Sequence, residues 1–384
     1  MSPGSEEVLP FNRATRAPRQ VEYLAASFFS DRISGDGPFS HRCVEALAPH
    51  LNSDRVLLTP SCTSALEMAA LLSDVGPGDE VIVPSFTFVS SANAFLLFGA
   101  TPVFADIDPF RFNVTPESIA QAITARTKAV VVVHYGGVSC DMGRIRALCD
   151  EHGLLLIEDC AHALFASSCG RPLGTHGDVA TFSFHETKNV TCGEGGALLV
   201  NRDDWWDRAL IVREKGTDRT RFMLGQVDKY TWVDRGSSYL LADPLAAIVL
   251  AQLEFVDVIQ ARRKEAWLRY ATELPSWATQ VGAQLPTEVT RHDVSPYHLF
   301  PVLLADNPSR DAFLEHCRSL GVTSVFHYLP LHESRIGRQV APDADCPVTV
   351  NVSGRLARLP LFSDITRAEV DRVIDVVTKF RGLS

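Results

Sequence analysis

The 384-residue sequence lacks several patterns that would assign a chain to a common class. It has no apolar run near the ~20 residues needed to cross a bilayer, and its acidic start, MSPGSEEV, has no signal-peptide character. Its nine cysteines form no C-x-x-C pairs, which argues against a zinc site or a disulfide framework. A formal charge of −10 argues against nucleic-acid or anionic-membrane partners. We therefore expect a cytoplasmic protein with reduced thiols, no metal site and no membrane partner.

Composition and pattern favour an α/β protein. The sequence is 46% hydrophobic and 21% charged, which is ordinary for a globular chain of this length. Short apolar runs alternate with helical segments from residue 55 to residue 184, which is typical of a mainly parallel sheet. A long helix is expected from 245 to about 270. The predicted parts are an N-terminal arm (1–28), a large α/β domain (29–250) and a small C-terminal α+β domain (251–384).

Residues 179–201 read VATFSFHETKNVTCGEGGALLVN and contain the first candidate catalytic residue. The apolar run 179–184 predicts a buried strand, a polar turn follows it, and 197–200 predicts a returning strand. Lys188 therefore stands at a strand edge with apolar chain on both sides. Burial there would favour the neutral amine, which can form a Schiff base. A solvated surface lysine is the alternative interpretation.

Three other candidate positions also lie at or just past the end of an apolar run, where parallel sheets bind ligands. Thr63 and Ser64 stand between a strand and a helix N-terminus, an arrangement that cradles a phosphate or simply caps the helix. Asp159 ends a predicted buried strand, so its carboxylate needs a cationic or hydrogen-bonding partner. That partner could also be a helix end or a salt bridge. Phe88 follows another short strand and offers an apolar ring.

Together these positions meet the four demands of an aromatic aldehyde phosphate. Lys188 would take the aldehyde, Asp159 the ring nitrogen, Thr63 and Ser64 the phosphate, and Phe88 the ring face. A carboxylate beside a pyridine nitrogen keeps the ring protonated, which makes pyridoxal phosphate an electron sink. The sequence therefore predicts a pyridoxal 5'-phosphate enzyme. A dinucleotide-binding oxidoreductase is disfavoured because no G-x-G-x-x-G follows the first strand.

A set of longer motifs resembles the sugar-nucleotide aminotransferases of the DegT/StrS family over residues 10–380. The motifs are SCTSALEMAA, VPSFTFVSSANAF, IEDCAHA, FSFHETKN, GEGGALLVN, REKGTDR, QVDKYTWVDRGSSYLLAD, FHYLPLH and RLPLF. FSFHETKN, REKGT and QVDKYTW are most similar to members that make dTDP-4-amino-4,6-dideoxygalactose. The resemblance implies the aspartate-aminotransferase-like fold type I of pyridoxal phosphate enzymes, with a mixed, mostly parallel sheet. It also implies a homodimer with shared active sites, L-glutamate as donor and a dTDP-4-keto-6-deoxyglucose acceptor.

The resemblance also implies roles for single residues. Lys188 would be the Schiff-base lysine, Asp159 the partner of the ring nitrogen, and Phe88 the residue on the ring face. His162 would bond the ring hydroxyl. The phosphate would be held by Thr63, Ser64 and Ser183. Relatives also carry a G-x-N-x-R motif that contacts the neighbouring subunit's phosphate; here it reads GSSYL, with Ser238 in the Asn position and Leu240 in the Arg position.

Substrate contacts and the exact reaction leave alternatives open. His185 is a candidate sugar contact or a turn residue, and Tyr328 and His332 are candidates from the small domain or parts of a structural turn. Arg213 and Lys215 are candidate cations for a carboxylate or diphosphate, or exposed helix charges. The competing functions are a 3-aminotransferase, a dehydratase (expected to carry His in place of Lys188) and a non-catalytic regulator that binds the cofactor or a sugar nucleotide. The configuration of the new amine, galacto or gluco, stays open.

Overall fold

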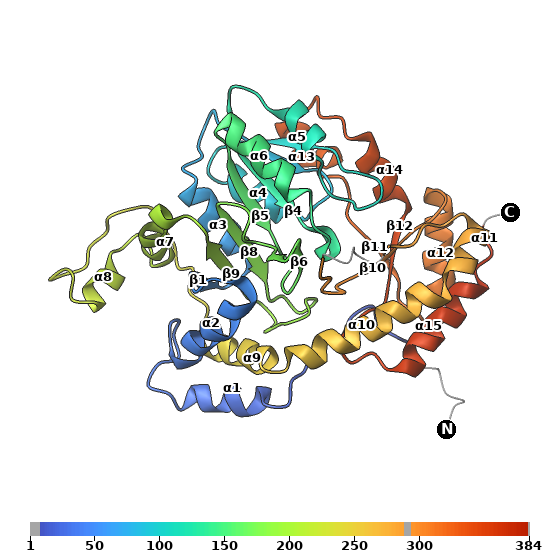
Figure 1. The fold of residues 1–384 in the computed structure, drawn as a ribbon, viewed down its shortest axis with the longest axis horizontal. Helices are drawn as coiled ribbons and strands as arrows, with labels where there is room; N and C mark the ends of the chain where they lie inside the picture. Colours follow the sequence, from blue (N-terminus) through green and yellow to red (C-terminus); the bar gives the residue numbers. More distant parts are fainter. Residues whose placement is uncertain (1–7, 288–292, 383–384) are drawn as a thin grey trace.

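A computed structural model describes residues 8–287 and 293–382. The first seven residues, on which the expectation about a signal peptide largely depends, lie outside this range, as does the same part of the predicted arm. At the centre is a seven-stranded sheet of order β1-β9-β8-β5-β4-β2-β3 (Figure 1). Within it only β9 runs against its neighbours, so the sheet is mixed and mostly parallel. In spatial order the strands are β1 (Val56–Thr59), β9 (Gly196–Val200), β8 (Val179–Ser183), β5 (Leu155–Asp159), β4 (Thr127–Val133), β2 (Glu80–Pro84) and β3 (Thr101–Ala105).

Helices cover both faces of this sheet because its strands are apolar on both sides. In β8, Val179 packs toward one face, while Ala180 and Phe182 pack toward the other. Strands buried on both faces are typical of parallel sheets, which explains the continuous apolar runs in the sequence. One face carries α3 (Cys62–Leu72), α4 (Ser90–Leu96) and α7 (Trp206–Arg213). The other carries α2 (Pro38–Leu51), α5 (Pro116–Ala122), α6 (Met142–His152) and α9 (Asp243–Leu253).

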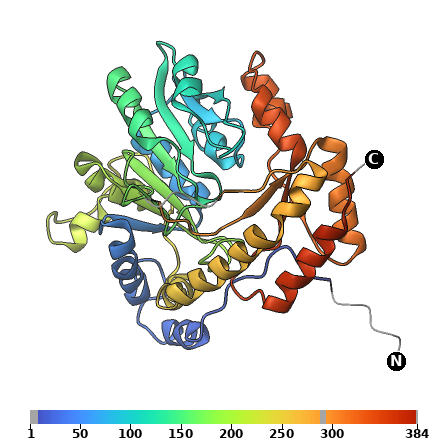
Figure 2. The same ribbon diagram turned by 45° about the vertical axis from the view of Figure 1, so that its right-hand side comes forward.

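The long helix expected from 245 to about 270 is two helices. α9 ends at Leu253, α10 (Val256–Glu273) begins three residues later, and the pair is bent by 63°. The bend occurs because the two helices pack against different partners: α9 against α1 and α2, and α10 against α15. Figure 2 shows α10 running from the sheet region to the C-terminal helices. The periodicity was continuous in sequence, but its apolar faces belong to two cores.

The C-terminal unit, residues 256–382 as far as they are described, has its own antiparallel sheet of order β10-β12-β11. Its core contains Trp267, Phe300 and Phe313. The predicted boundary at 250/251 falls inside α9, and the division into domains stays a proposal. The elements of the unit are β10 (Phe300–Leu303), β11 (Val325–Phe326), β12 (Leu356–Leu359), α10, α11 (Pro275–Val281), α12 (Asn307–Ser319), η3 (Leu331–Glu333), α13 (Arg335–Val340), α14 (Pro347–Arg355) and α15 (Arg367–Lys379).

The predicted arm is only partly extended. Its later part forms α1 (Gln20–Phe28), which packs on α9, whereas Leu9 makes a parallel bridge to Val322 of the C-terminal unit. A protruding segment, from about residue 216 to residue 235, carries α8 (Arg219–Met223) away from the sheet (Figure 1). The remaining short elements are η1 (Tyr135–Gly137), β6 (Ser167–Ser168), β7 (Arg171–Pro172) and η2 (Asp203–Trp205).

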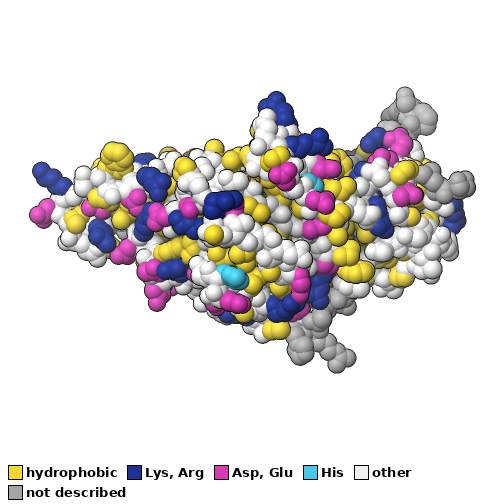
Figure 3. All heavy atoms as spheres, turned by 90° about the horizontal axis from the view of Figure 1, so that it is seen from above, with side chains coloured by type: hydrophobic (Ala, Val, Ile, Leu, Met, Phe, Trp, Pro, Cys, Tyr) yellow, Lys and Arg dark blue, Asp and Glu magenta, His cyan; other side chains and the backbone are white. Residues whose placement is uncertain are grey.

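Two further observations concern the charged side chains on the surface and the length of the apolar helices. Acidic and basic side chains are interspersed on the face seen in Figure 3. In the described part of the chain no single helix is long and apolar enough to cross a membrane, and only the bent pair α9 and α10, taken together, reaches that length and composition.

Candidate active site

A cavity of about 580 Å³ lies at the C-terminal ends of β5 and β8 and is closed on its other side by the C-terminal unit. Ligands of parallel sheets bind at this end of the strands. Eight of the predicted site residues line it: Thr63, Phe88, Asp159, His162, Ser183, His185, Lys188 and Tyr328. The structure therefore brings together residues that are far apart in sequence.

Lys188 lies in the turn that follows β8. The turn is fixed by backbone hydrogen bonds from Glu186 N–H to the Gly193 carbonyl (2.9 Å) and from Lys188 N–H to the His185 carbonyl (2.9 Å). Burial lowers the pKa of the Lys188 amine to about 8, although the neighbouring Asp159 partly opposes this shift. The neutral amine, which is the nucleophilic form, is therefore available close to neutral pH.

Asp159 ends β5 and is buried at the cavity wall. Its Oδ2 accepts a hydrogen bond from the Ser91 hydroxyl at 2.7 Å, and its Oδ1 accepts one from the Ala161 N–H at 3.0 Å. Burial raises the pKa of this carboxyl, while the two hydrogen bonds and the charge of Lys188 oppose the rise. A cationic ring nitrogen beside the carboxyl would favour its ionised form further.

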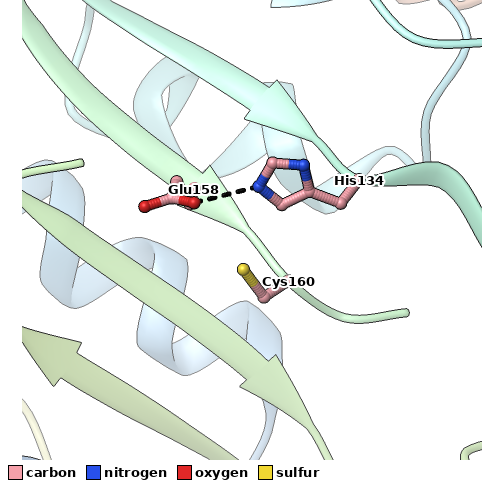
Figure 4. A group of neighbouring side chains, drawn as sticks. All are labelled: His134, Glu158 and Cys160. Atoms are coloured by element: carbon pink, nitrogen blue, oxygen red, sulfur yellow. Dashed lines mark hydrogen bonds and ion pairs between the residues drawn. The ribbon is translucent and has the colours of Figure 1, made fainter. Parts of the chain in front are cut away.

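Glu158, the residue of β5 before Asp159, forms a buried polar group with His134 and Cys160 (Figure 4). The His134 Nε2 lies 3.0 Å from the Glu158 carboxylate, which also accepts the backbone N–H groups of Gly174, His176 and Gly177 at 2.5 to 2.9 Å. The Cys140 N–H donates to His134 Nδ1 at 3.2 Å, so the ring donates to Glu158 from Nε2. Burial raises the pKa of the Cys160 thiol to about 12, which keeps it protonated. These groups already satisfy one another, and we interpret them as support for the end of β5.

The N-terminus of α3 borders the cavity. Ser61 caps this helix, because its hydroxyl accepts the Ser64 N–H at 3.0 Å. The backbone N–H groups of a first helical turn have no partner within the helix and can bind an anion. Gly196 allows β9 to approach, since a Cβ there would lie 2.5 Å from Cys62 N. Thr63 lines the cavity at this end, whereas Ser64 takes part in the cap and does not line the cavity.

Phe88 and the start of α4 form the rest of the cavity wall on the side of the large sheet. The Phe88 ring is 57% exposed, and its centroid lies 6.5 Å from that of Tyr328, so one ring face is available to a planar ligand. The Thr87 hydroxyl lies 2.9 Å from the Ser91 hydroxyl, which in turn donates to Asp159. This pair orients the carboxylate from the start of α4.

His162 offers a hydrogen-bond donor to the cavity. The Gly136 N–H donates to its Nδ1 at 3.3 Å, so the neutral ring carries its proton on Nε2, 3.5 Å from the Tyr328 hydroxyl. Burial, together with the charges of Lys188 and Arg358, lowers the pKa of His162 well below its ordinary value. A neutral imidazole donating from Nε2 is suited to a ring hydroxyl or phenolate.

The opposite wall is a cluster of rings and one cation from the C-terminal unit. His298 packs on His162 with ring centroids 4.5 Å apart, and His327 Nδ1 lies 2.9 Å from the Tyr135 hydroxyl. Burial lowers the pKa values of both His298 and His327 well below the ordinary value, so these rings are neutral. Arg358 lines the same wall.

Besides Ser64, four predicted residues lie outside this cavity. Arg213 is buried and pairs with Asp36 at 2.6 Å, and Lys215 pairs with Glu214 at 2.8 Å. His332 is buried, with Nδ1 at 2.6 Å from the Ser85 hydroxyl. Ser238 is exposed at the base of the protruding segment, where it forms a bridge to Glu214.

Sequence reasoning missed several residues that line the cavity: Phe11, Asn12, Ser90, His298, His327 and Arg358. His327 and Arg358 belong to the motifs FHYLPLH and RLPLF. They were not selected because the first candidates were chosen for lying at the ends of predicted strands of the large sheet. Ser91, the hydrogen-bond donor to Asp159, carried no separate signal either, since a serine at a helix start is ordinary.

The arrangement fits a pyridine aldehyde phosphate. A poised amine, a buried carboxylate, a helix N-terminus and an exposed aromatic ring surround one cavity, and a neutral imidazole donor faces it. Lys188, Asp159, Thr63, Ser183, Phe88 and His162 are the residues that would hold the group.

Comparison with known proteins points the same way. The model of the DegT/DnrJ/EryC1/StrS aminotransferase family matches residues 15–378. The aminotransferase TlmJ from Streptoalloteichus hindustanus is 31% identical, with 97% of this chain and 98% of that chain covered and a TM-score of 0.89. The sugar aminotransferase CalS13 from Micromonospora echinospora is 26% identical (97% and 99% covered, TM-score 0.87). Spr1654 from Streptococcus pneumoniae, in its PMP-form, is 25% identical (97% and 99% covered, TM-score 0.89).

These matches confirm the predicted fold and cofactor. The molecule has the fold of pyridoxal phosphate-dependent aminotransferases, consistent with fold type I, and its cofactor is pyridoxal 5'-phosphate. The match spans nearly the whole chain. The protein belongs to the DegT/DnrJ/EryC1/StrS aminotransferase family and is a pyridoxal phosphate-dependent sugar aminotransferase.

Proposed function

We propose that the protein transfers the amino group of L-glutamate to C4 of dTDP-4-keto-6-deoxy-D-glucose, giving a dTDP-4-amino-4,6-dideoxyhexose. The observation that carries the proposal is the pairing of Lys188, with its pKa of about 8, and Asp159 in one cavity. The motifs FSFHETKN, REKGT and QVDKYTW support C4 and the dTDP sugar, because they resemble members with that activity. A cavity of about 580 Å³ is also ample for small-molecule substrates.

The mechanism assigns each step to a side chain. Bound pyridoxal phosphate supplies an aldehyde for the amino group and a ring that stabilises negative charge at the reacting carbon. Lys188 Nζ takes the proton from the reacting carbon of the amino donor and, in the second half-reaction, delivers one to C4 of the sugar. The Asp159 carboxylate, which accepts from the Ser91 hydroxyl, would keep a proton on the ring nitrogen. His162, whose Nδ1 accepts from the Gly136 N–H, would donate from Nε2 to the ring hydroxyl.

The phosphate would be held at the sheet side. We assign it to the first turn of α3, to Thr63 and to Ser183, all of which border the cavity. Backbone N–H groups and hydroxyls anchor an anion without adding charge. This anchoring fixes the ring against Phe88 and leaves the C-terminal wall for the substrates.

We also propose a homodimer in which each subunit completes the other's site. Ser238, the proposed trans contact to the phosphate, is exposed. The segment next to it carries exposed apolar side chains, with Met223, Leu224 and Trp232 exposed by 65%, 67% and 78%. Contiguous exposed apolar groups of this kind mark interaction surfaces. Sedimentation velocity should show a dimer, and a monomer at micromolar concentration would contradict this part of the proposal.

The alternatives predict different products. A 3-aminotransferase would use the same residues but aminate C3. A dehydratase is disfavoured because Lys188 is a lysine rather than the expected histidine. A regulator would bind the cofactor or the sugar nucleotide without turnover.

One experiment separates them. The purified holoenzyme is incubated with L-glutamate and dTDP-4-keto-6-deoxyglucose, and the product is analysed by proton NMR. We expect an amine on C4, and the coupling constants give its axial or equatorial orientation. A parallel incubation contains the corresponding 3-keto sugar in place of the 4-keto sugar. An amine formed on C3 of the 3-keto sugar, with none formed on the 4-keto sugar, would exclude the proposed position. Formation of 2-oxoglutarate is measured in parallel, and its absence would favour the regulator.

A further inference from the structure

Two charged residues in the cavity lining are not used by the mechanism above: Glu194, an exposed carboxylate 3.8 Å from His185, and Arg358. Arg358 is the cation of the two. It lies on β12, and two contacts hold its planar group. The guanidinium carbon lies 4.7 Å from the ring centroid of Phe11, and Nη2 donates to the Phe326 carbonyl at 2.9 Å. Stacking and a backbone hydrogen bond together orient the guanidinium before any ligand arrives.

The charge of Arg358 is not balanced by an acid in the described part of the chain. Its Nε is buried and has no hydrogen-bond partner, and the described residues give it no ion pair. Burial lowers the pKa of Arg358, and the groups facing it are the hydroxyls of Tyr135 and Tyr328. Arg358 as a whole is half-buried. A guanidinium withdrawn from water in this way is best paired with a carboxylate or phosphate that accepts two parallel N–H groups.

The position of Arg358 favours one kind of anion. Arg358 and Lys188 line the same cavity, and the charge of Arg358 contributes to the lowered pKa of the Lys188 amine. An anion bound at Arg358 would therefore share the cavity with the reacting amine. In an amino acid the α-carboxylate is bonded to the very carbon that carries the amine. In a nucleotide-linked hexose the diphosphate is attached to C1, across the sugar ring from C4. The cofactor phosphate, in turn, is accounted for by α3 on the sheet side.

We propose that Arg358 binds a carboxylate of the amino donor and thereby selects amino acids as donors; the inference rests on the proposed aminotransferase function. The neighbouring imidazoles of His162, His298 and His327 are neutral, so they add no competing charge. The donor's carboxylate would meet Nε and a terminal nitrogen of the fork, with Phe11 supporting the opposite side of the group. This role is one of binding and positioning rather than proton transfer.

The test uses holoenzyme with Arg358→Met and Arg358→Lys, and Arg318→Gln as a matched control. Arg318 is an exposed arginine of the same unit that pairs with the neighbouring Glu315. The two half-reactions are followed separately by stopped-flow absorbance: glutamate with the aldehyde form, and the keto-sugar with the amine form. We expect Arg358→Met to lower the second-order rate constant for glutamate about 10- to 100-fold. The rate constant for the keto-sugar should change much less, and Arg358→Lys should give an intermediate loss.

A second readout does not depend on turnover. Glutarate, an unreactive dicarboxylate, should bind the wild-type holoenzyme in calorimetric titration and bind Arg358→Met about 10- to 100-fold more weakly. A loss confined to the keto-sugar half-reaction would assign Arg358 to the diphosphate instead and overturn the proposal. Equal losses in both half-reactions, or unchanged glutamate and glutarate binding, would overturn it as well. Failure of the wild type to react with the keto-sugar would count against the proposed function alone, since glutarate binding still tests Arg358.

Discussion

The two walls of the cavity are built differently. On the sheet wall, Asp159 ends β5, and Lys188 lies in the turn after β8, which is fixed by backbone hydrogen bonds. On the C-terminal wall, Tyr328 follows the short strand β11, and its position depends on contacts between rings. Groups on regular elements are held more accurately than groups on loops, which are in turn easier to vary. The comparison indicates that the sheet wall sets the reaction, and the other wall sets which molecules react.

Replacing the amine should have the largest effect. Lys188→Ala removes both the covalent anchor and the proton carrier, so turnover should fall by at least about 10⁴-fold. Steady-state assays measure the loss, and mass spectrometry after borohydride reduction should find no cofactor on the denatured variant. The matched control is Lys379→Ala, which removes an exposed lysine paired with Asp375. Covalently attached cofactor in Lys188→Ala would refute the assignment of this lysine.

Neutralising the carboxylate should come next. Asp159→Asn keeps the size of the side chain but removes its charge, and we expect turnover to fall on the order of 10²- to 10³-fold, as when one preorganised electrostatic group is lost. The comparison of walls predicts a similar loss in both half-reactions, measured by stopped flow. A loss restricted to one substrate would show that the sheet wall also discriminates between substrates.

The C-terminal wall should be sensitive to its buried support. Arg263 is 1% exposed and donates to the backbone carbonyls of His298 (2.7 Å) and Leu361 (3.2 Å), both residues of the cavity wall. Arg263→Met leaves these carbonyls unsatisfied, so the free energy of unfolding should fall by about 3 to 5 kcal/mol in urea titrations. Arg262→Met, one position along the same helix and exposed, should change it by less than about 1 kcal/mol. An equal change in the free energy of unfolding for both variants would contradict the structural role assigned to Arg263.

Cofactor capture should depend on pH through Lys188. Because burial lowers the pKa of this amine to about 8, the neutral nucleophile predominates above that pH and is lost below it. The rate of pyridoxal phosphate uptake by cofactor-free protein should therefore fall roughly tenfold per unit below pH 8. Stopped-flow absorbance from pH 6 to 9 measures this dependence. A rate that still rises about tenfold per unit between pH 8 and pH 9 would indicate an ordinary, solvated lysine with a pKa of 10.5.

The smallest effect is expected for one hydroxyl of the C-terminal wall. Tyr328→Phe removes the contact between the tyrosine hydroxyl and His162 Nε2 at 3.5 Å but keeps the ring. Turnover should fall about threefold to tenfold, in keeping with the loss of one neutral hydrogen bond. Tyr23→Phe, which removes a hydroxyl that donates to Glu254 outside the cavity, is the control. A loss as large as that of Asp159→Asn would mean that the two walls contribute equally to the chemistry.

The same comparison explains what the sequence could predict. Lys188, Asp159 and Thr63 could be found because ends of buried strands and a helix N-terminus are visible as local patterns. Arg358 could not be found in that way, since its neighbours Phe11 and Phe326 are brought to it only by tertiary packing. Tertiary packing also explains the wrong prediction for His332. Its residue type and motif suited a substrate contact, but in the fold its ring contacts Ser85. The bend after α9 was missed because periodicity does not show which core a helix face joins.

The start of the chain ties the two walls together. Leu9 exchanges backbone hydrogen bonds with residues 321 and 323 of the C-terminal unit (2.9 and 3.0 Å), and the Asn12 amide donates to the Glu186 carbonyl in the turn that carries Lys188 (3.2 Å). Between them, Phe11 lies against Arg358. A proteolytic cut or an affinity tag that displaces these few residues would thus alter substrate selection and the catalytic turn at once, with every residue of the sheet intact. An affinity tag is therefore best attached to the C-terminus.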